Sequence, residues 1–342
     1  MRFIAFYLPQ FHPIKENDAI YGPGFTEWDN VRAAKPLFFG HYEPHIPHKC
    51  LGYYSLLDAN FLRFQHDLAL NYGVQAFCYY YYNFGGHTLL KKPLTLIRRA
   101  KEIRNSYCCC WVHTDWYDNR KAPNTPFLQQ HYSPKNAIAL FLDLLPFFED
   151  DRYIKINNAP LLLIWAPERH PLLPVYSEIL RNLAHRHGFP NLYLAGVEAY
   201  CAMHPLALGL DGMVEFAPDW LKENHVSAPD ERPVRIDYTK TIQFMLGKPL
   251  PDYQRMRCTF PGWDNTPRRG SEGIACVNLN QELFQQALEK LVLYTNQHLP
   301  EQLHYVFINA WNEWGEGCHL EPDVQNGFAY LNCVRAVAQT ST

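Results

Sequence analysis

Two glutamates near the C-terminus have the residue type and spacing of a catalytic carboxylate pair. Glu313 and Glu316 are three positions apart in the segment FINAWNEWGEGCHLEPD, residues 307–323, and a tryptophan stands two residues before each of them. A carboxyl near an apolar wall has a raised pKa and can protonate a leaving oxygen, while its partner stays ionised as base or nucleophile. Cleavage of a glycosidic bond requires this division of roles.

The local backbone decides whether the two carboxyls can cooperate. If the chain turns at Gly315 and Gly317, residues three apart become neighbours on one face. A continued strand would send their side chains to opposite faces. The plainer alternative makes Glu313 a helix cap and Glu316 a solvated loop residue, because charged side chains lie mostly at the surface. The elements that precede the pair favour the catalytic interpretation.

Short β-rich runs recur along the whole chain, and most are followed by an amphipathic stretch. The expected strands are 2–8, 75–81, 107–112, 160–165, 192–198, 212–216, 257–263 and 305–311. The expected helices lie near 56–72, 89–104, 135–149, 171–187, 237–246, 281–298 and 327–338. Strands that alternate with helices pair in parallel through crossovers. We therefore predict an α/β fold, a single (β/α)₈ TIM barrel that forms one catalytic domain over residues 1–342, with long βα loops at its C-terminal face.

Two connections are longer than a barrel needs. The first runs from about residue 9 to residue 54, and the second follows the sixth strand as APDWLKENHVSAPDERPV, residues 217–234. Long loops in a compact domain are commonly functional or disordered, and the first is too aromatic for disorder. We expect it to build one wall of an open cleft.

Polar and aromatic residues gather where the expected strands end and in the first long loop. Catalytic groups of a TIM barrel lie at the C-terminal strand ends, so these positions are candidates for substrate binding. Only alternate strand residues face the barrel interior, so a packing role competes with a site role at each position. The candidates beside Glu313 and Glu316 are Tyr7, Gln10, His12, Glu27, Trp28, Tyr80, Tyr82, Trp111, His113, Asp115, Glu198, Glu215, Trp263, Asp264, Arg268, Trp311, Asn312 and Trp314.

Composition narrows the class of ligand. Lys plus Arg total 31 against 34 for Asp plus Glu, so no basic excess exists to bind nucleic acid. No apolar run approaches the roughly 20 residues that span a bilayer, and the N-terminal run reads as a strand, not a signal peptide. Three consecutive cysteines in a strand-like run favour reduced thiols and a cytoplasmic location. Aromatic residues make up 15% of the chain, which suits both a core and a site that grips the C–H faces of sugars.

Other catalytic chemistries lack their motifs. The chain has no GxSxG, GxxxxGK[ST], GxGxxG or HExxH segment, which weighs against serine hydrolases, NTPases, simple dehydrogenases and zincins. His41, His45 and His48 have a spacing that could suit zinc, but Pro44 and Pro47 break any helix that would align them. We therefore expect neither a metal nor a cofactor.

Several long segments in a fixed order resemble one known family. They are FYLPQFHPI (6–14), GFTEW (24–28), KPLFFGHYEPHIP (35–47), YGVQAFCYYYY (72–82), FPGWDNTPRR (260–269) and AWNEWGEGCHLEPD (310–323). Nearly end to end, the chain resembles the WbsX-type proteins, a branch similar to glycoside hydrolase family 99. Family 99 enzymes are (β/α)₈ barrels that cleave α-mannosidic linkages inside chains, with retention of configuration and without a metal.

The resemblance implies roles for the two glutamates. By motif position, Glu313 would draw the proton from the sugar's own 2-hydroxyl, which attacks the anomeric carbon to give an anhydro-sugar. Glu316 would protonate the leaving oxygen and later activate water. Family 99 commonly has His where this chain has Gly315. WbsX proteins typically show WANENW where this chain has WVHTDW (111–116), so the resemblance does not carry over the sugar specificity.

Three functions compete on this basis. The first is an endo-acting, retaining glycoside hydrolase whose substrate is a polysaccharide or oligosaccharide, with α-linked mannose as the sugar that the resemblance suggests. The second is a glycosyltransferase or transglycosylase of surface-polysaccharide synthesis, because WbsX proteins are frequently labelled glycosyltransferases. The third is a carbohydrate-binding barrel without activity. Retention of both glutamates argues against the third, because binding alone needs no general acid.

Overall fold

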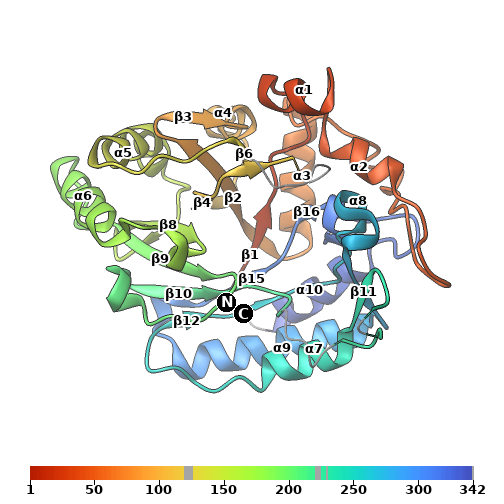
Figure 1. Cartoon of the computed structure of the whole chain (residues 1–342). Helices are drawn as coiled ribbons and strands as arrows, with labels where there is room; N and C mark the ends of the chain where they lie inside the picture. The colour runs from red at the N-terminus through yellow and green to blue at the C-terminus, as the bar shows by residue number, and fades with distance from the viewer. Residues whose placement is uncertain (119–125, 220–224, 229, 341–342) are drawn as a thin grey trace.

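Parallel strands form the centre of the molecule and helices surround them (Figure 1). The structure is a computed structural model, and it describes residues 1–118, 126–219, 225–228 and 230–340. The parallel ladder runs β12, β10, β9, β8, β4, β2, β1, β15, β13. Its strands are β1 (Arg2–Tyr7), β2 (Val74–Phe84), β4 (Ser106–Trp111), β8 (Ala159–Trp165), β9 (Tyr193–Glu198), β10 (Gly212–Glu215), β12 (Arg255–Met256), β13 (Cys258–Thr259) and β15 (Tyr305–Ile308). The predicted barrel is confirmed.

The seventh strand closes the barrel by changing neighbours. Its first half, β12, pairs with β10, and its second half, β13, pairs with β15 on the other side. The prediction of a strand over 257–263 was wrong at both ends. The strand begins at Arg255 and stops at Thr259, since Pro261 has no N–H for a ladder and the Trp263 carbonyl accepts instead from Cys276 N–H at 2.7 Å.

Helices cover the outside of the barrel near the predicted positions. Asp58, Ser133, Asp237 and Asn280 precede four of them, and each side chain accepts a hydrogen bond from the first turn. Such caps satisfy N–H groups that a helix leaves unpaired at its start. The outer helices are α3 (Ala59–Asn71), α4 (Lys92–Arg99), α5 (Pro134–Phe148), α6 (Leu173–Arg186), α7 (Tyr238–Leu246), α9 (Gln281–His298) and α10 (Ala329–Thr340).

The first long connection contains two helices that were not predicted, α1 (Lys15–Tyr21) and α2 (Glu27–Ala33). A capping box between Thr26 and Asp29 starts α2 and so places Glu27 in its first turn. In Figure 1, α1, α2 and the short α8 (Thr266–Arg269) gather along one side of the barrel mouth. The long first connection, predicted as a loop, thus folds into a compact wall that contains two short helices.

The second long connection adds a strand beside the barrel. β11 (Val234–Asp237) pairs in parallel with β14 (Ile274–Val277) outside the main ladder. Residues 220–224 and 229 of this connection lie outside the described residues. Short hairpins extend other strands: β3 (His87–Leu89) pairs with β2, β7 (Lys155–Ile156) with β8, and β5 (Trp116–Tyr117) with β6 (Pro126–Leu128).

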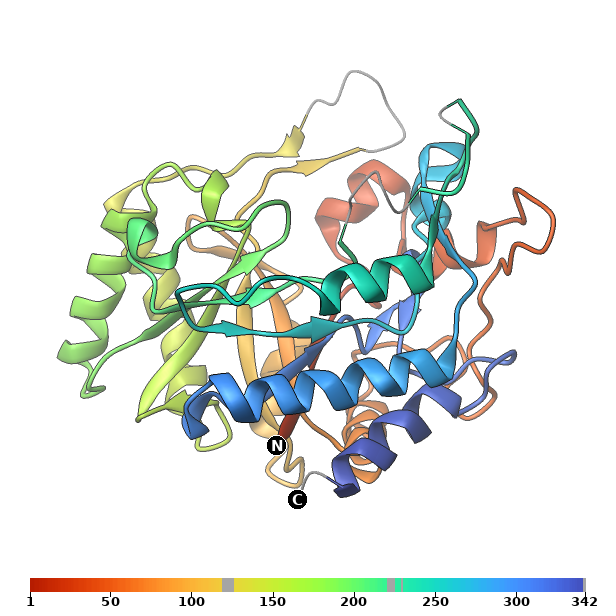
Figure 2. The same ribbon diagram turned by 90° about the horizontal axis from the view of Figure 1, so that it is seen from below.

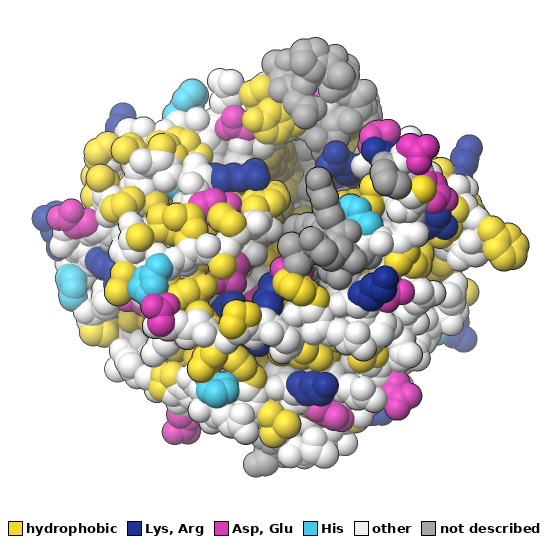
Figure 3. Space-filling model, turned by 60° about the horizontal axis from the view of Figure 1, so that its bottom comes forward, with side chains coloured by type: hydrophobic (Ala, Val, Ile, Leu, Met, Phe, Trp, Pro, Cys, Tyr) yellow, Lys and Arg dark blue, Asp and Glu magenta, His cyan; other side chains and the backbone are white. Residues whose placement is uncertain are grey.

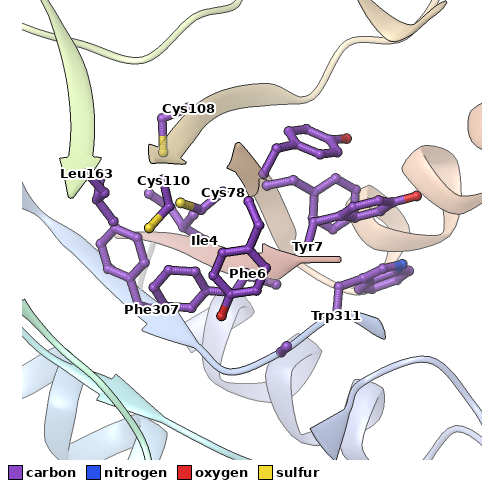
Figure 4. Packing of buried hydrophobic residues seen from close by; sticks show 14 of the residues in the cluster. Ile4, Phe6, Tyr7, Cys78, Cys108, Cys110, Leu163, Phe307 and Trp311 are labelled. Atoms are coloured by element: carbon purple, nitrogen blue, oxygen red, sulfur yellow. The ribbon is translucent and has the colours of Figure 1, made fainter. Parts of the chain in front are cut away.

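The barrel interior is filled by aromatic rings and thiols. Figure 4 shows Ile4, Cys78, Cys110, Leu163 and Phe307 together, while Tyr7 and Trp311 lie at the right of the view, near the end of β1. All of these side chains are buried. All ten cysteines are free thiols, as the sequence predicted. A packed interior leaves no room for a ligand inside the barrel, so binding is confined to its end.

The two ends of the barrel differ. Figure 2 places the chain termini at the bottom of the view and α1, α8 and the β5–β6 hairpin at the top. The top is the end at which the parallel strands stop, the usual location of a TIM-barrel site. None of the described helices is both long and apolar enough to cross a membrane.

Candidate active site

The chain turns sharply where the two glutamates stand. After β15, the short strand β16 (Asn312–Glu313) leads into a single 3₁₀ turn, η6 (Trp314–Glu316), and the chain returns as β17 (Cys318–His319). Gly317 adopts the left-handed conformation with φ of 53°, which glycine tolerates without strain. The turn, and not a continued strand, brings the two carboxyls to one side.

Arg268 of α8 joins the two carboxylates. Its Nη2 donates to Glu313 Oε2 at 2.8 Å and its Nη1 donates to Glu316 Oε1 at 2.6 Å. Its Nε donates to Glu27 Oε1 at 2.7 Å. One guanidinium therefore holds three carboxylates from distant parts of the chain, a geometry that suits its planar fork of donors and not a lysine.

Glu27 reaches this arginine through the space that Gly315 leaves open. A Cβ built on Gly315 would overlap Glu27 Oε1 and would lie 2.8 Å from Arg268 Nε. Any side chain there would displace the Glu27 carboxylate or the arginine. The space that a side chain at position 315 would occupy therefore holds a carboxylate that comes from α2.

Burial and charge oppose each other at the glutamates. Burial raises the pKa of Glu313 to about 8, and Glu316 and Glu27 add to the rise while Arg268 opposes it. Burial also raises the pKa of Glu316, again against the charge of Arg268. Burial alone would lower the pKa of Arg268, but the carboxylates outweigh it and hold the pKa well above its usual range. The cluster thus combines a permanent cation with two glutamates, Glu313 and Glu316, whose pKa values burial raises.

A cavity of about 650 Å³ opens beside this cluster. Figure 3 shows the surface hollowed near this end of the molecule, with hydrophobic side chains around the opening. Aromatic rings supply much of the wall and the carboxyls lie at its side, an arrangement that suits a ligand with apolar faces and hydroxyl groups. The predicted site residues that line it are Gln10, Glu27, Tyr80, Tyr82, Asp115, Trp263, Arg268, Glu313 and Glu316.

Five other predicted residues are buried within or near the turn and do not line the cavity. The Asn312 amide pairs with both backbone groups of Leu8, at 2.7 and 3.0 Å, and so ties the turn to the end of β1. Trp314 Nε1 donates to Glu321 Oε2 at 2.7 Å, and Trp28 Nε1 donates to the Tyr54 carbonyl at 2.8 Å. The five residues are Tyr7, Trp28, Trp311, Asn312 and Trp314.

The remaining predicted residues lie apart from the cavity. Glu215 is fully buried in an ion pair with Arg257 at 2.6 Å, and Glu198 accepts from the Tyr253 hydroxyl at 2.6 Å. His113 lies between the Tyr132 hydroxyl and the Ala166 carbonyl. Their polar groups have protein partners, so the structure brings them into packing networks. Trp111, His12 and Asp264 likewise do not line this cavity.

The structure adds cavity residues that sequence reasoning missed. Asn17 of α1 is fully buried at the cavity wall, and neither its Oδ1 nor its Nδ2 has a hydrogen-bond partner among the described residues. Trp165 and Phe216 form a T-shaped pair at the cavity with ring centroids 4.7 Å apart. Trp165 ends an expected strand and could have been noticed there, whereas no local signal distinguishes Asn17. Asn265, Arg269 and Tyr200 also line the cavity.

Two solved structures with a similar fold are described as a glycoside hydrolase and a glycoside hydrolase-like protein. The family 99 endo-α-mannosidase from Bacteroides thetaiotaomicron aligns with a TM-score of 0.64 at 14% sequence identity, over 99% of this chain and 97% of that one. A second structure, described as a glycoside hydrolase-like protein, aligns with a TM-score of 0.63 at 14% identity, over 98% and 93%. Similarity at this identity establishes the barrel fold and not the activity.

Sequence comparison identifies closer relatives. The WxcX proteins of two Xanthomonas campestris pv. campestris strains, both described as uncharacterized, are 36% identical over 341 residues, which cover 97% of this chain. This chain spans about half the length of those relatives, 49%. The profile of the family described as Glycosyltransferase WbsX matches residues 3–334. The resemblance read from the motifs is confirmed, and the chain belongs to the WbsX glycosyltransferase family.

Proposed function

We propose that this protein is a retaining glycoside hydrolase or transglycosylase that acts inside α-linked polysaccharide or oligosaccharide chains. The observation that carries the proposal is the shared guanidinium of Arg268, which holds Glu313 and Glu316 on one side of an aromatic cavity. Cleavage of a glycosidic bond needs an acid and a base, and two carboxyls with shifted pKa values at a sugar-sized cavity can supply both.

The chemistry implied by the family resemblance fits this arrangement. Glu313 removes the proton of the sugar 2-hydroxyl as O2 bonds to C1, while Glu316 gives its proton to the leaving oxygen as the C1–O bond breaks. Water or an acceptor hydroxyl then gives its proton to Glu316 and attacks C1, and O2 recovers its proton from Glu313. Each carboxyl ends the cycle in its starting state, and two inversions at C1 give overall retention.

Substrate recognition in this proposal uses the cavity wall. Rings such as Tyr80, Tyr82 and Trp165 offer faces to sugar C–H groups. The unpartnered amide of Asn17 can exchange hydrogen bonds with a sugar hydroxyl, because a buried amide without a partner is costly until a ligand satisfies it. Mannose is the sugar that the resemblance suggests.

Kinetics of two variants test the roles of the glutamates. Glu316→Gln should abolish cleavage of a natural glycan but retain part of the activity on a substrate with an activated leaving group, because such a group departs without an acid. Glu313→Gln should lose both activities. Glu289→Gln, an exposed site on α9, serves as the matched control. Equal activity of wild type and Glu316→Gln on the natural glycan would remove Glu316 from this role.

Glycosyl transfer is the second candidate, because the family profile is described as a glycosyltransferase. It predicts that a nucleotide sugar raises the melting temperature and serves as donor. A rise with oligosaccharide alone, together with release of a product of retained configuration, supports hydrolysis. Glycan binding without turnover of any bound ligand would instead support a carbohydrate-binding barrel.

A further inference from the structure

A second cavity of about 470 Å³ lies behind the active-site turn. Trp263 lines both cavities, and Gly317, directly after Glu316, belongs to this second one. No lysine or arginine is among the described residues that line it. Besides the phenols of Tyr42 and Tyr330 and the thiol of Cys276, the ionisable groups of its wall are carboxyls and imidazoles, and we call it the histidine cavity. The carboxyls and imidazoles are those of His41, His45, Asp264, Glu282, His319, Glu321 and Asp323.

Two imidazoles in the histidine cavity meet edge to face. His45 Nδ1 and His319 Nε2 are 2.8 Å apart, and the ring planes are inclined by 84°. His319 Nδ1 lies 2.8 Å from the Glu321 carbonyl and so must carry the proton. The Nε2 lone pair of His319 therefore faces His45. A backbone carbonyl that fixes the proton on the far nitrogen is the usual second contact of a metal-binding histidine.

A carboxylate completes the group. Asp323 Oδ2 lies 4.0 Å from His319 Nε2, and the ligand atoms of His45, His319 and Asp323 all lie within 4.8 Å of one another. Asn326 donates to both Asp323 oxygens, which fixes the orientation of that carboxylate. Asp323 is 2% exposed, and among the described residues its only ion-pair partner is the His319 imidazole. A buried carboxylate without a lysine or arginine favours a bound cation.

A neighbouring group of similar composition is excluded by its hydrogen bonds. His41, Glu43 and Asp264 also place their ligand atoms together. However, His41 Nδ1 accepts the Leu37 N–H at 3.0 Å, so His41 Nε2 carries the proton that it donates to Asp264. Neither nitrogen of His41 has a free lone pair, so His41 cannot act as a metal ligand in this arrangement.

We infer that His45, His319 and Asp323 bind one divalent transition-metal ion, with zinc as the best match, and that water from the cavity fills the fourth position. Two imidazoles, one carboxylate and an open position are a common zinc ligand set. Zinc bonds of about 2.0–2.2 Å place tetrahedral ligand atoms about 3.3–3.6 Å apart, so the side chains need to shift by roughly an ångström or less. The proton of His45 moves from Nδ1 to Nε2, with no net change in charge.

The position of this site suggests a structural role. His319 stacks on Trp314, with ring centroids 3.7 Å apart, and Trp314 belongs to the same turn as Glu316. A metal on His319 would hold that ring and so brace the turn from behind. The inference departs from the sequence-based expectation of a metal-free protein, because residue 45 comes close to residues 319 and 323 only in the folded chain.

Metal analysis tests the inference. Protein stripped with chelator and dialysed against zinc chloride should retain one zinc per chain, and its melting temperature should rise. His45→Gln and Asp323→Asn should each abolish retention, whereas His298→Gln, an exposed imidazole at the end of α9, should not. Circular dichroism of each variant shows whether it is folded. Retention of a full equivalent of zinc by folded His45→Gln or Asp323→Asn would overturn the assignment.

One competing site needs its own control. His48 Nδ1 lies 3.1 Å from the thiol of Cys50, which is exposed, so this pair could take up zinc instead. Zinc retention should survive Cys50→Ser. Cobalt bound at the inferred site should show ligand-field bands without the near-ultraviolet charge-transfer band that a thiolate produces. Loss of zinc in Cys50→Ser, or a thiolate band with cobalt, would place the metal at Cys50 and refute the inference.

Discussion

The active-site cavity and the histidine cavity lie on either side of one turn and balance their buried acids in different ways. On one side, the guanidinium of a single arginine donates hydrogen bonds to Glu27, Glu313 and Glu316. On the other, Asp264 and Asp323 are surrounded by imidazoles and backbone N–H groups, without an arginine or lysine among the described lining residues. The carboxyls of the active-site cavity thus share one cation, the guanidinium of Arg268. The carboxylates of the histidine cavity are instead stabilised by several weaker contacts with imidazoles and N–H groups.

Removal of the arginine should have the largest effect. Arg268→Met removes the guanidinium that Glu27, Glu313 and Glu316 share and should lower the free energy of unfolding by about 3–5 kcal/mol, as for other broken buried ion pairs. Urea unfolding measures the loss. The double variant Arg268→Met/Glu27→Gln should recover part of it, because one of the stranded charges is then gone. An unchanged unfolding free energy in Arg268→Met would contradict the single-cation description.

Filling the space beside Glu27 should have the next largest effect. Gly315→Ala places a methyl group on the Glu27 carboxylate oxygen and should destabilise the protein by about 1–3 kcal/mol, the usual cost of overpacking. Glu27→Ala in the same chain should relieve the clash, so the two substitutions should be strongly non-additive in a double-mutant cycle. If the two losses of unfolding free energy were additive, the Glu27 carboxylate would not be the reason for a glycine at position 315.

The pH dependence of stability should report Glu313. Its pKa is raised to about 8 in the folded protein from an ordinary value of 4.5. Between these values the folded chain holds a proton that the unfolded chain has lost, so stability falls as pH rises, by at most about 1.4 kcal/mol per pH unit. Urea midpoints of wild type and Glu313→Gln, measured from pH 5 to 8, should diverge in slope. If the urea midpoints of the two proteins changed with pH in parallel, the pH dependence of stability would come from a group other than Glu313.

Activity should follow the same group. On a substrate with an activated leaving group, which needs no acid, kcat/KM should rise with pH up to about 8 if Glu313 acts as the base, because only the ionised carboxyl accepts a proton. A fall of kcat/KM through that pH would exchange the roles of Glu313 and Glu316.

A single contact of the histidine cavity should matter least. His41→Gln removes one imidazole from Asp264, but the Thr266 N–H still donates to Asp264 at 2.9 Å. The expected loss is about 0.5–1.5 kcal/mol, the range for one hydrogen bond, again measured by urea unfolding. A loss as large as that of Arg268→Met would show that this cavity also depends on one residue.

Local patterns predicted much of the framework. The strand–helix alternation and the caps at Asp58 and Asn280 are encoded within short windows, and so the barrel order followed from them. Helices α1 and α2 were missed because each is only seven residues long and lacks a long amphipathic repeat. The end of the seventh strand was missed because the Trp263 carbonyl accepts a hydrogen bond from the Cys276 N–H. Cys276 belongs to β14, a strand outside the main ladder.

The sequence by itself determined the fold class, the family motifs and the glutamate pair, because these depend on residue types at short spacing. Only the tertiary structure decided what surrounds the pair. Arg268 and Glu27 are separated by 241 positions, yet their ion pair closes on the space left by Gly315. His45 and His319 meet across 274 positions. Such contacts depend on how the barrel closes and on which elements meet at its mouth, and no local periodicity encodes that.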